Sequence, residues 1–194
     1  MQKKRALSGM SLVVILSVLF LISCGKQQSS TEMKQSQVER GKYLVTIGGC
    51  NDCHSPKIIT EQGPVPDEKR LLSGHPADES FAEFDPKLVA PGKWILFSQT
   101  LTAAAGPWGI SYAANLTPDN DTGIGLWEEK HFIGALRNGK HMGEGRPILP
   151  PMPWPMIGQM NDADMKAVFA YLKSLPPIKN RVPTPVPLDE IMSK

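Results

Sequence analysis

The sequence has little excess charge of either sign, only three cysteines and no apolar run that would span a bilayer comfortably. Among its 194 residues, 21 are Lys or Arg and 19 are Asp or Glu, and the formal net charge is +2. Without the first 23 residues, 18 basic and 19 acidic residues remain. Because nucleic-acid-binding proteins normally carry a basic excess on one face, this balance speaks against that class. The length and composition fit one compact, loop-rich domain or two small ones.

The N-terminus has the pattern of an export signal. Three basic residues at positions 3–5 precede an apolar stretch, Leu12 to Ile22, long enough for the core of a signal peptide but short for a membrane span. The residues Leu21-Ile22-Ser23-Cys24-Gly25 resemble the lipobox of bacterial lipoproteins. The resemblance implies that residues 1–23 are removed and that Cys24 is acylated, which would hold the domain on the periplasmic side of a bacterial membrane. The alternative is an uncleaved anchor with an incidental cysteine.

The residues after Cys24 predict the following division of the chain. Residues 24–37 are rich in Gln, Ser, Lys and Thr and have hardly any apolar side chain to bury, so we expect a flexible tether. We expect the folded domain over residues 38–180, with an insertion at 57–113, and a Pro-rich tail at 181–194.

Two cysteines remain for the folded domain, and they form the pattern Cys50-Asn51-Asp52-Cys53-His54. This is the C-x-x-C-H signature of covalent haem attachment. Two thiols at this spacing reach the two vinyl groups on one edge of a porphyrin, and the adjacent His54 can then bind the iron. The motif predicts one haem c, attached through Cys50 and Cys53.

Three other interpretations of the motif are weaker. A dithiol redox centre is expected at a helix start after a strand, whereas the residues before Cys50 have a helical pattern. A zinc site needs four ligands and there is no second cysteine pair, although the histidines at 54, 75, 131 and 141 could contribute. A disulfide between Cys50 and Cys53 would close a small strained ring and leave the adjacent His54 unexplained.

Further motifs surround the haem signature: Gly41-Lys42-Tyr43-Leu44, Asn115-Leu116-Thr117-Pro118-Asp119 with Thr122-Gly123-Ile124-Gly125-Leu126-Trp127, and Pro151-Met152-Pro153-Trp154. Together they resemble monohaem class I cytochromes c, in particular the cytochrome modules of bacterial periplasmic and membrane-bound dehydrogenases. The resemblance covers roughly Glu39 to Pro177. It implies a mostly α fold, a small helical domain around one haem, in which the first and last helices cross near a glycine such as Gly41.

The apolar spacing predicts helices over residues 38–47, 127–138 and 161–175, the last with Asn161 as its N-cap. The insertion at 57–113 is expected to be loop-rich and to wrap the haem domain, with an amphipathic segment at 80–89 and a short strand at 94–97 that allows a β-hairpin. No second core is expected there.

In the resembling family the second axial ligand of the iron is a methionine. Met152 is the best candidate because four prolines at positions 150, 151, 153 and 155 make its loop stiff, which lowers the entropy lost when a weak thioether ligand is ordered. Met156 and Met142 are the next candidates, and His141 would give a bis-histidine haem. The alternative without metal ligation is that Met152 only packs under Trp154.

Other residues carry weaker expectations. Trp127 and Trp154 are assigned to packing in the haem pocket. Arg137 and Arg146 could pair with haem propionates, although a solvated surface position is commoner for a single arginine. His75 and His131 are expected to be surface or loop histidines. Asp119, Asp121 and Gly123 are expected to form a turn rather than a calcium-binding loop.

The resemblance implies an electron-transfer protein rather than an enzyme. The expected function is a membrane-tethered carrier with His54 and Met152 as axial ligands, which passes electrons from a periplasmic dehydrogenase toward a terminal oxidase or reductase. One alternative is a haem subunit of a dehydrogenase complex, with the 57–113 insertion as its interface. The other is a haem protein whose sixth site is open to peroxide or a gas.

Overall fold

The computed structural model describes residues 30–193, and the chain divides into two units, Met1–Gln37 and Val38–Lys194. The predicted signal segment, residues 1–23, and Cys24 lie outside the described residues. Of the predicted tether, residues 30–37 are described and are helical, with residues 30–36 exposed. This differs from the expected flexible coil because Glu32, Met33, Lys34 and Gln35 have high helix propensity, a preference that does not depend on burial.

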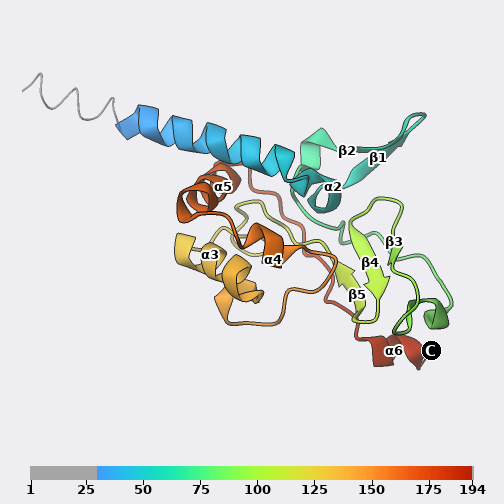
Figure 1. Cartoon of the computed structure of the whole chain (residues 1–194). Helices are drawn as coiled ribbons and strands as arrows, with labels where there is room; N and C mark the ends of the chain where they lie inside the picture. The colour runs from blue at the N-terminus through green and yellow to red at the C-terminus, as the bar shows by residue number, and fades with distance from the viewer. Residues whose placement is uncertain (1–29, 194) are drawn as a thin grey trace, which may run out of the picture. The chain divides into compact units, whose positions relative to one another are not determined.

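The second unit contains the predicted helices (Figure 1). A helix over residues 38–47 is followed, after a turn at Gly48 and Gly49, by the short helix that carries the haem motif. The further helices are α2 (Cys50–His54), α3 (Glu129–Asn138), α4 (Trp154–Ile157), α5 (Asp162–Ser174) and α6 (Leu188–Met192). The N-cap assignment is confirmed, because the Asn161 side chain accepts the Asp164 N–H at 2.8 Å. None of the helices within residues 30–193 has the length and apolar character needed to cross a membrane.

The helix at 38–47 crosses α5 at Gly41, as the resemblance predicts. A Cβ added at Gly41 would lie 1.9 Å from the Ala167 carbonyl oxygen and 2.7 Å from the Cβ of Tyr171. Only glycine leaves room for this approach of two helix backbones. Around the crossing lies the first core cluster, whose buried members are Leu44, Val45, Leu72, Ile124, Phe132, Leu136, Met165, Ala167, Val168 and Leu172.

The insertion contains more regular structure than the single hairpin that the sequence allows. Its strands are β1 (Lys57–Thr60), β2 (Gly63–Pro66), β3 (Leu96–Phe97), β4 (Ala103–Gly106) and β5 (Gly109–Tyr112). β1 and β2 form one antiparallel hairpin, and β3, β4 and β5 form a second antiparallel sheet in that order. The strand expected at 94–97 is shorter, and the amphipathic segment at 80–89 is irregular except for a 3-10 turn over Pro86–Val89.

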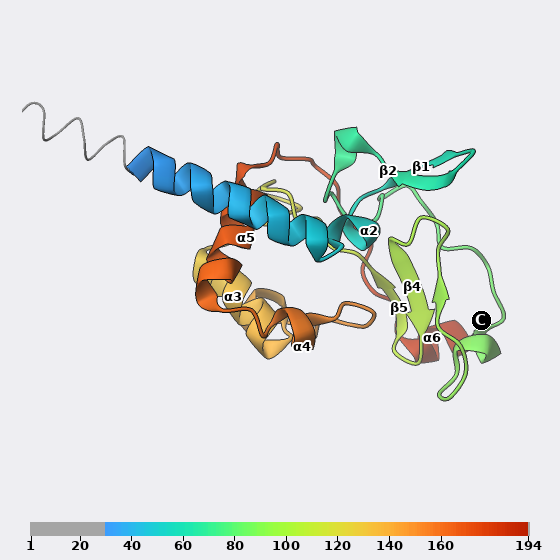
Figure 2. The ribbon, with the colours of Figure 1, turned by 45° about the horizontal axis from the view of Figure 1, so that its top comes forward.

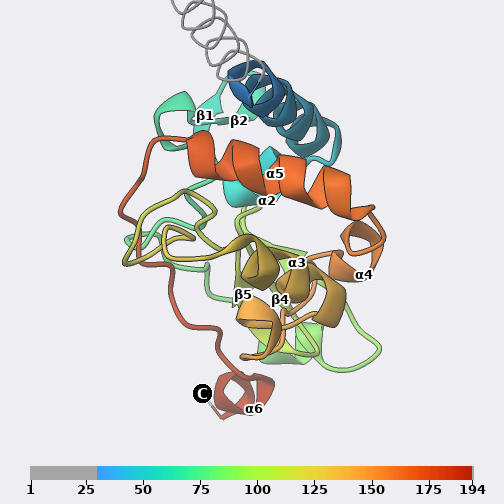
Figure 3. The same cartoon turned by 90° about the vertical axis from the view of Figure 1, so that its left-hand side faces the viewer.

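The second sheet and the C-terminal helix form a separate region of this unit. In the views of Figures 1 and 2, β4, β5 and α6 lie together, away from α3, α4 and α5. Figure 3 shows the same separation between α5 and α6 from another side. The insertion therefore builds a region of its own beside the helices.

The expectation that the insertion has no core of its own is wrong. A second core cluster is formed by the buried residues Val89, Ala105, Ile110 and Ile191, against which half-buried residues pack, including Phe81 and Leu96. The contributing segments are far apart in the chain. Short apolar stretches interrupted by Pro and Gly give no periodic signal, so the sequence pattern does not show that they meet.

The C-terminal residues 181–194 are more than a Pro-rich tail. Val186 pairs with Ile110 of β5 through two backbone hydrogen bonds of 2.8 and 3.0 Å, and α6 places Ile191 in the second core cluster. The described part of this segment therefore closes one side of the insertion.

Replacing Ile191 with alanine should lower the free energy of unfolding by about 2–4 kcal/mol, the usual cost of removing a buried branched side chain. Ile191 is 7% exposed, whereas its neighbour Met192 is 47% exposed. Denaturant unfolding of Ile191→Ala and of the control Met192→Ala tests this prediction. Equal stability of the two variants would show that the second core cluster contributes little.

Candidate functional site: a haem attachment helix

The two thiols of the haem motif lie on α2, which begins directly after Gly49. Gly49 has a φ of 64°, a left-handed conformation that allows the sharp turn from the preceding helix. Cys50 and Cys53 are three positions apart, so their side chains project from one side of α2. Both thiols are free and half-buried. Burial raises the pKa of the Cys50 thiol and that of the Cys53 thiol, so both are protonated at neutral pH.

The imidazole of His54 is held in a defined tautomer. His54 is 9% exposed, and its Nδ1 lies 2.8 Å from the carbonyl oxygen of Ala114. A carbonyl can only accept a hydrogen bond, so Nδ1 carries the proton and Nε2 keeps a free lone pair. Burial lowers the pKa of His54, which keeps the ring neutral. A neutral imidazole whose second nitrogen is oriented by a carbonyl is the usual form of a metal-ligating histidine.

The segment that contains the Ala114 carbonyl is held in place by hydrogen bonds of the next residue, Asn115. The Asn115 side chain accepts hydrogen bonds from the Thr117 N–H at 3.0 Å and the Thr117 hydroxyl at 2.7 Å, and it donates to the Ile178 carbonyl at 2.8 Å. The sequence motif Asn115-Leu116-Thr117 marks this segment. Its role as the support of His54 was not evident from the sequence.

Lys57 stabilises the end of α2 and was not identified from the sequence. Its ammonium donates to three backbone carbonyls, those of Asn51, Asp52 and Ser55, at 3.0, 2.9 and 2.6 Å. These carbonyls lie within or just after α2, where helix carbonyls lack partners, and a cation there is favourable. The signal available in the sequence was a lysine three positions after the motif. In Figure 2, α2 leads directly into the β1–β2 hairpin that begins at Lys57.

Met152 is half-buried and packs against the first core cluster, as Cys50 does. The rival candidates differ: Met156 is 68% exposed and Met142 is 38% exposed, and neither is among the residues that pack on this cluster. His141 contacts Trp127 edge-to-face, with ring centroids 4.9 Å apart. The structure therefore brings Met152, and neither Met156 nor Met142, to the cluster that Cys50 contacts.

Trp127 and Trp154 both pack against the first core cluster. The Trp154 ring also covers Gly139 at the end of α3, where an added Cβ would lie 2.4 Å from the ring. Both contacts agree with a packing role for the two indoles.

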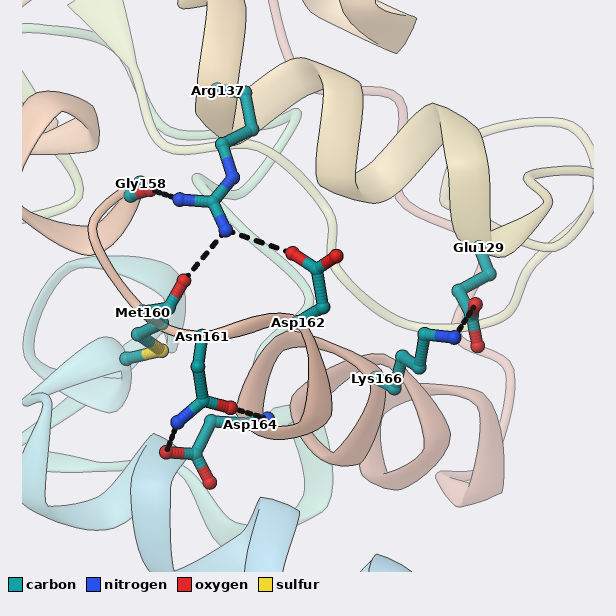
Figure 4. Close-up of polar contacts among 8 residues, drawn as sticks. All are labelled: Glu129, Arg137, Gly158, Met160, Asn161, Asp162, Asp164 and Lys166. Atoms are coloured by element: carbon teal, nitrogen blue, oxygen red, sulfur yellow. Dashed lines mark hydrogen bonds and ion pairs between the residues drawn. The ribbon is translucent and has the colours of Figure 1, made fainter.

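The Arg137 side chain binds the junction between α4 and α5 (Figure 4). Its guanidinium donates to the carbonyl of Gly158, to that of Met160 at 2.8 Å and to the Asp162 carboxylate at 2.9 Å. These contacts hold the start of α5, a role different from the propionate partner considered from the sequence. Arg146 is exposed and donates at 3.4 Å to the Pro147 carbonyl.

His75 lies in a loop, as expected, but the expectation of a surface position is wrong. His75 is fully buried, with Nδ1 2.8 Å from the Thr102 hydroxyl and Nε2 3.0 Å from the Glu79 carbonyl. Its sequence neighbourhood of Gly, Pro and acidic residues resembles an exposed loop, but both ring nitrogens are hydrogen-bonded, to Thr102 and to Glu79, inside the fold. His131 instead caps α3, because its Nδ1 accepts the Glu128 N–H.

The turn assigned to Asp119 is confirmed. Its carboxylate accepts the N–H groups of Asp121 and Thr122 at 3.1 and 2.8 Å. Within residues 30–193 no group of three or more His, Cys, Asp and Glu side chains is arranged to hold a metal ion.

The arrangement fits a covalently attached haem. Two free thiols project from one side of α2, the following histidine has its Nε2 free, and a methionine packs on the core cluster that the first cysteine contacts. This donor set, two thiols with a nitrogen and a thioether ligand, is that of c-type haem.

Comparison with known proteins shows which proteins this chain is related to. No family model matches the chain. Over 148 residues, 76% of the chain, it is 42% identical to a nicotinate dehydrogenase chain of Pseudomonas putida. It is 34% identical over 79% of its length to the alcohol dehydrogenase (quinone) cytochrome c subunit of Gluconobacter oxydans, and 32% identical over 84% to the fructose dehydrogenase cytochrome subunit of Gluconobacter japonicus. The chain is homologous to the cytochrome c subunits of bacterial dehydrogenases.

The resemblance drawn from the motifs is therefore confirmed at the level of these cytochrome modules. The chain spans 9%, 24% and 27% of the length of the three relatives, so they contain much that this chain does not match. At this level the comparisons support an electron-transferring haem subunit rather than a catalytic enzyme.

Proposed function

We propose that the chain is an exported, lipid-anchored electron-transfer protein that holds one haem c through Cys50 and Cys53, with His54 and Met152 as the axial ligands. The observation that carries the proposal is the geometry of α2, where two free thiols precede a buried histidine whose Nδ1 is bound by the Ala114 carbonyl. When bound, the haem supplies single-electron chemistry at its iron. The chain's residues provide attachment, ligation and an apolar surrounding.

The residues divide this work as follows. The Cys50 and Cys53 thiols form the two covalent links, which also keep the group attached during reduction and oxidation. His54 presents Nε2 as a ligand without rotating, because Nδ1 is fixed. The stiff loop of Met152 limits movement of the thioether. An electron can then enter and leave with little rearrangement of the chain, which favours fast transfer.

A thioether ligand and an apolar environment both favour the reduced state. The first core cluster, against which Cys50 and Met152 pack, consists of buried apolar side chains. A positive charge on the ferric state is poorly solvated in such surroundings, so the reduction potential is raised.

The proposed partner is a dehydrogenase that donates electrons. The three relatives carry the names of nicotinate, alcohol and fructose dehydrogenase subunits, which favours a dehydrogenase over an unrelated donor. The subunit form of the proposal, with a long-lived complex, differs from a free carrier only in how long the partners stay together. Anchoring through Cys24 would confine the domain to a bacterial membrane surface on the periplasmic side, where it would pass the electrons on to a terminal oxidase or reductase.

Replacing Met152 with alanine should abolish the weak far-red absorption band of methionine bound to ferric haem iron. The band should be present in the unchanged protein and in the control Met156→Ala, because the Met156 side chain is 68% exposed. Optical spectra of oxidised protein matured with its haem test this prediction. A band that persists in Met152→Ala would reject Met152 as the ligand. A high-spin spectrum of the unchanged protein that shifts when carbon monoxide is added to the reduced form would indicate an open sixth site instead.

A further inference from the structure

The loop that contains Met152 can donate few hydrogen bonds of its own. Pro150, Pro151, Pro153 and Pro155 have no backbone N–H. The Met152 N–H is used locally, donating at 3.3 Å to the Leu149 carbonyl. The Pro153 carbonyl accepts the N–H groups of Met156 and Ile157 at 3.0 and 3.1 Å, whereas no backbone N–H among the described residues binds the Pro150 carbonyl. The Pro150 carbonyl therefore depends on a side-chain donor or on water.

Ser111 on β5 supplies one such donor. Its hydroxyl lies 2.6 Å from the Pro150 carbonyl and accepts the indole N–H of Trp108 at 3.1 Å. Because an indole N–H can only donate, the contact with Trp108 leaves the Ser111 proton available for a carbonyl. The competing Ala104 carbonyl is 3.4 Å away, so the proton is directed to Pro150. Ser111 is 7% exposed, and water therefore competes little for this bond.

Ser111 is itself held by rigid surroundings. It lies opposite Ala104 in the β4–β5 ladder. The ring of Trp108 lies over Gly106, where an added Cβ would be 2.5 Å from the indole. A donor placed on a paired strand and oriented by a packed indole positions its acceptor more accurately than a donor on a loop.

Hydrogen bonds from Arg137 hold the chain on the C-terminal side of Met152. Arg137 of α3 binds the carbonyls of Gly158 and Met160, as Figure 4 shows. The segment between Pro150 and Gly158 is thus tied at one end to the insertion and at the other to α3. Met152 lies two positions from the Ser111 contact.

We infer that Ser111 is a positioning residue for the axial methionine: through the Pro150 carbonyl, the insertion holds the loop that presents Met152. This inference rests on the proposed ligation by Met152. It assigns a role to the 57–113 insertion, which anchors the ligand loop.

Imidazole competition tests the inference, because added imidazole binds the ferric iron only where Met152 dissociates. In the full-length protein with its haem attached, Ser111→Ala should strengthen apparent imidazole binding about fivefold, the effect of one lost hydrogen bond on the population of the released state. Ser111→Thr keeps the hydroxyl and should restore the original affinity. Ser98→Ala is the matched control, since the Ser98 hydroxyl bonds within the insertion, to the Ala103 N–H and with Thr100.

A double-mutant cycle separates positioning from general destabilisation. In a Met152→Ala background there is no methionine to release, so Ser111→Ala should leave imidazole affinity unchanged. An unchanged affinity in Ser111→Ala alone, an equal effect of Ser98→Ala, or an effect that persists in the Met152→Ala background would each overturn the inference. Failure of the ligand assignment is recognised separately, by a far-red band that survives in Met152→Ala with Ser111 intact.

Discussion

A chain in which Cys50 and Cys53 are both replaced by alanine should mature without covalently attached haem. The two thiols are free and half-buried on one side of α2, and no other cysteine lies within residues 30–193. Without them there is no group in this part of the chain that can form a thioether link. Haem staining of the denatured protein on a gel measures attachment directly, and the expected signal is zero.

Variants with only one of the two cysteines replaced test each covalent link separately. Cys50→Ala and Cys53→Ala should each retain at most one covalent link, with a shifted absorption maximum of the reduced protein. Asp52→Ala is the control, because Asp52 lies between the cysteines, is exposed and contributes no link. Staining that survives the double substitution would refute the attachment site and with it the proposed function.

Gly41→Ala should destabilise the domain by about 3 kcal/mol or more, a large fraction of the 5–15 kcal/mol typical of a folded protein. The new Cβ would lie 1.9 Å from the Ala167 carbonyl oxygen and 2.6 Å from its carbon. Both are backbone atoms of α5, so no side-chain rotation relieves the overlap and the two helices must separate. Denaturant unfolding and haem incorporation measure the effect.

Gly134→Ala provides the matched control, because it is the same substitution in another helix, α3. At Gly134 the nearest atom to the added Cβ is the Gly143 Cα at 3.4 Å, an ordinary contact. Alanine is the better helix former, so stability should change by no more than about 1 kcal/mol, and in the favourable direction. If Gly41→Ala were as stable as Gly134→Ala, the crossing of the helices would not depend on close packing at this glycine.

Features encoded within a few neighbouring residues could be predicted well. The C-x-x-C-H motif, the N-cap at Asn161 and the apolar spacing of the helices at 38–47 and 162–174 each depend on local geometry. The helix crossing at Gly41 was implied by the family resemblance, and the propensity cost of a glycine inside a helix indicated only that something approaches closely there. By contrast, the helix at 30–37 was missed because a lack of apolar side chains to bury does not exclude residues of high helix propensity from forming a helix.

Features that depend on distant segments could not be predicted. His75 is held by Thr102, which lies 27 positions further along the chain, and Arg137 binds the α4–α5 junction because α3 packs beside it. The second core cluster requires Ile191 near the C-terminus to meet Ala105 and Ile110. None of these contacts leaves a periodic pattern in the sequence.

The sequence by itself determined the chemistry proposed for this protein: which thiols and which histidine make up the C-x-x-C-H motif, and which family of cytochrome modules it resembles. The tertiary structure alone decided how that chemistry is held, through the Ala114 carbonyl on His54, the Lys57 ammonium on α2 and the Ser111 hydroxyl on the Met152 loop. The reason is physical. A covalent motif needs only the right residues at the right spacing, whereas a hydrogen bond between segments needs the path of the whole chain to bring donor and acceptor together.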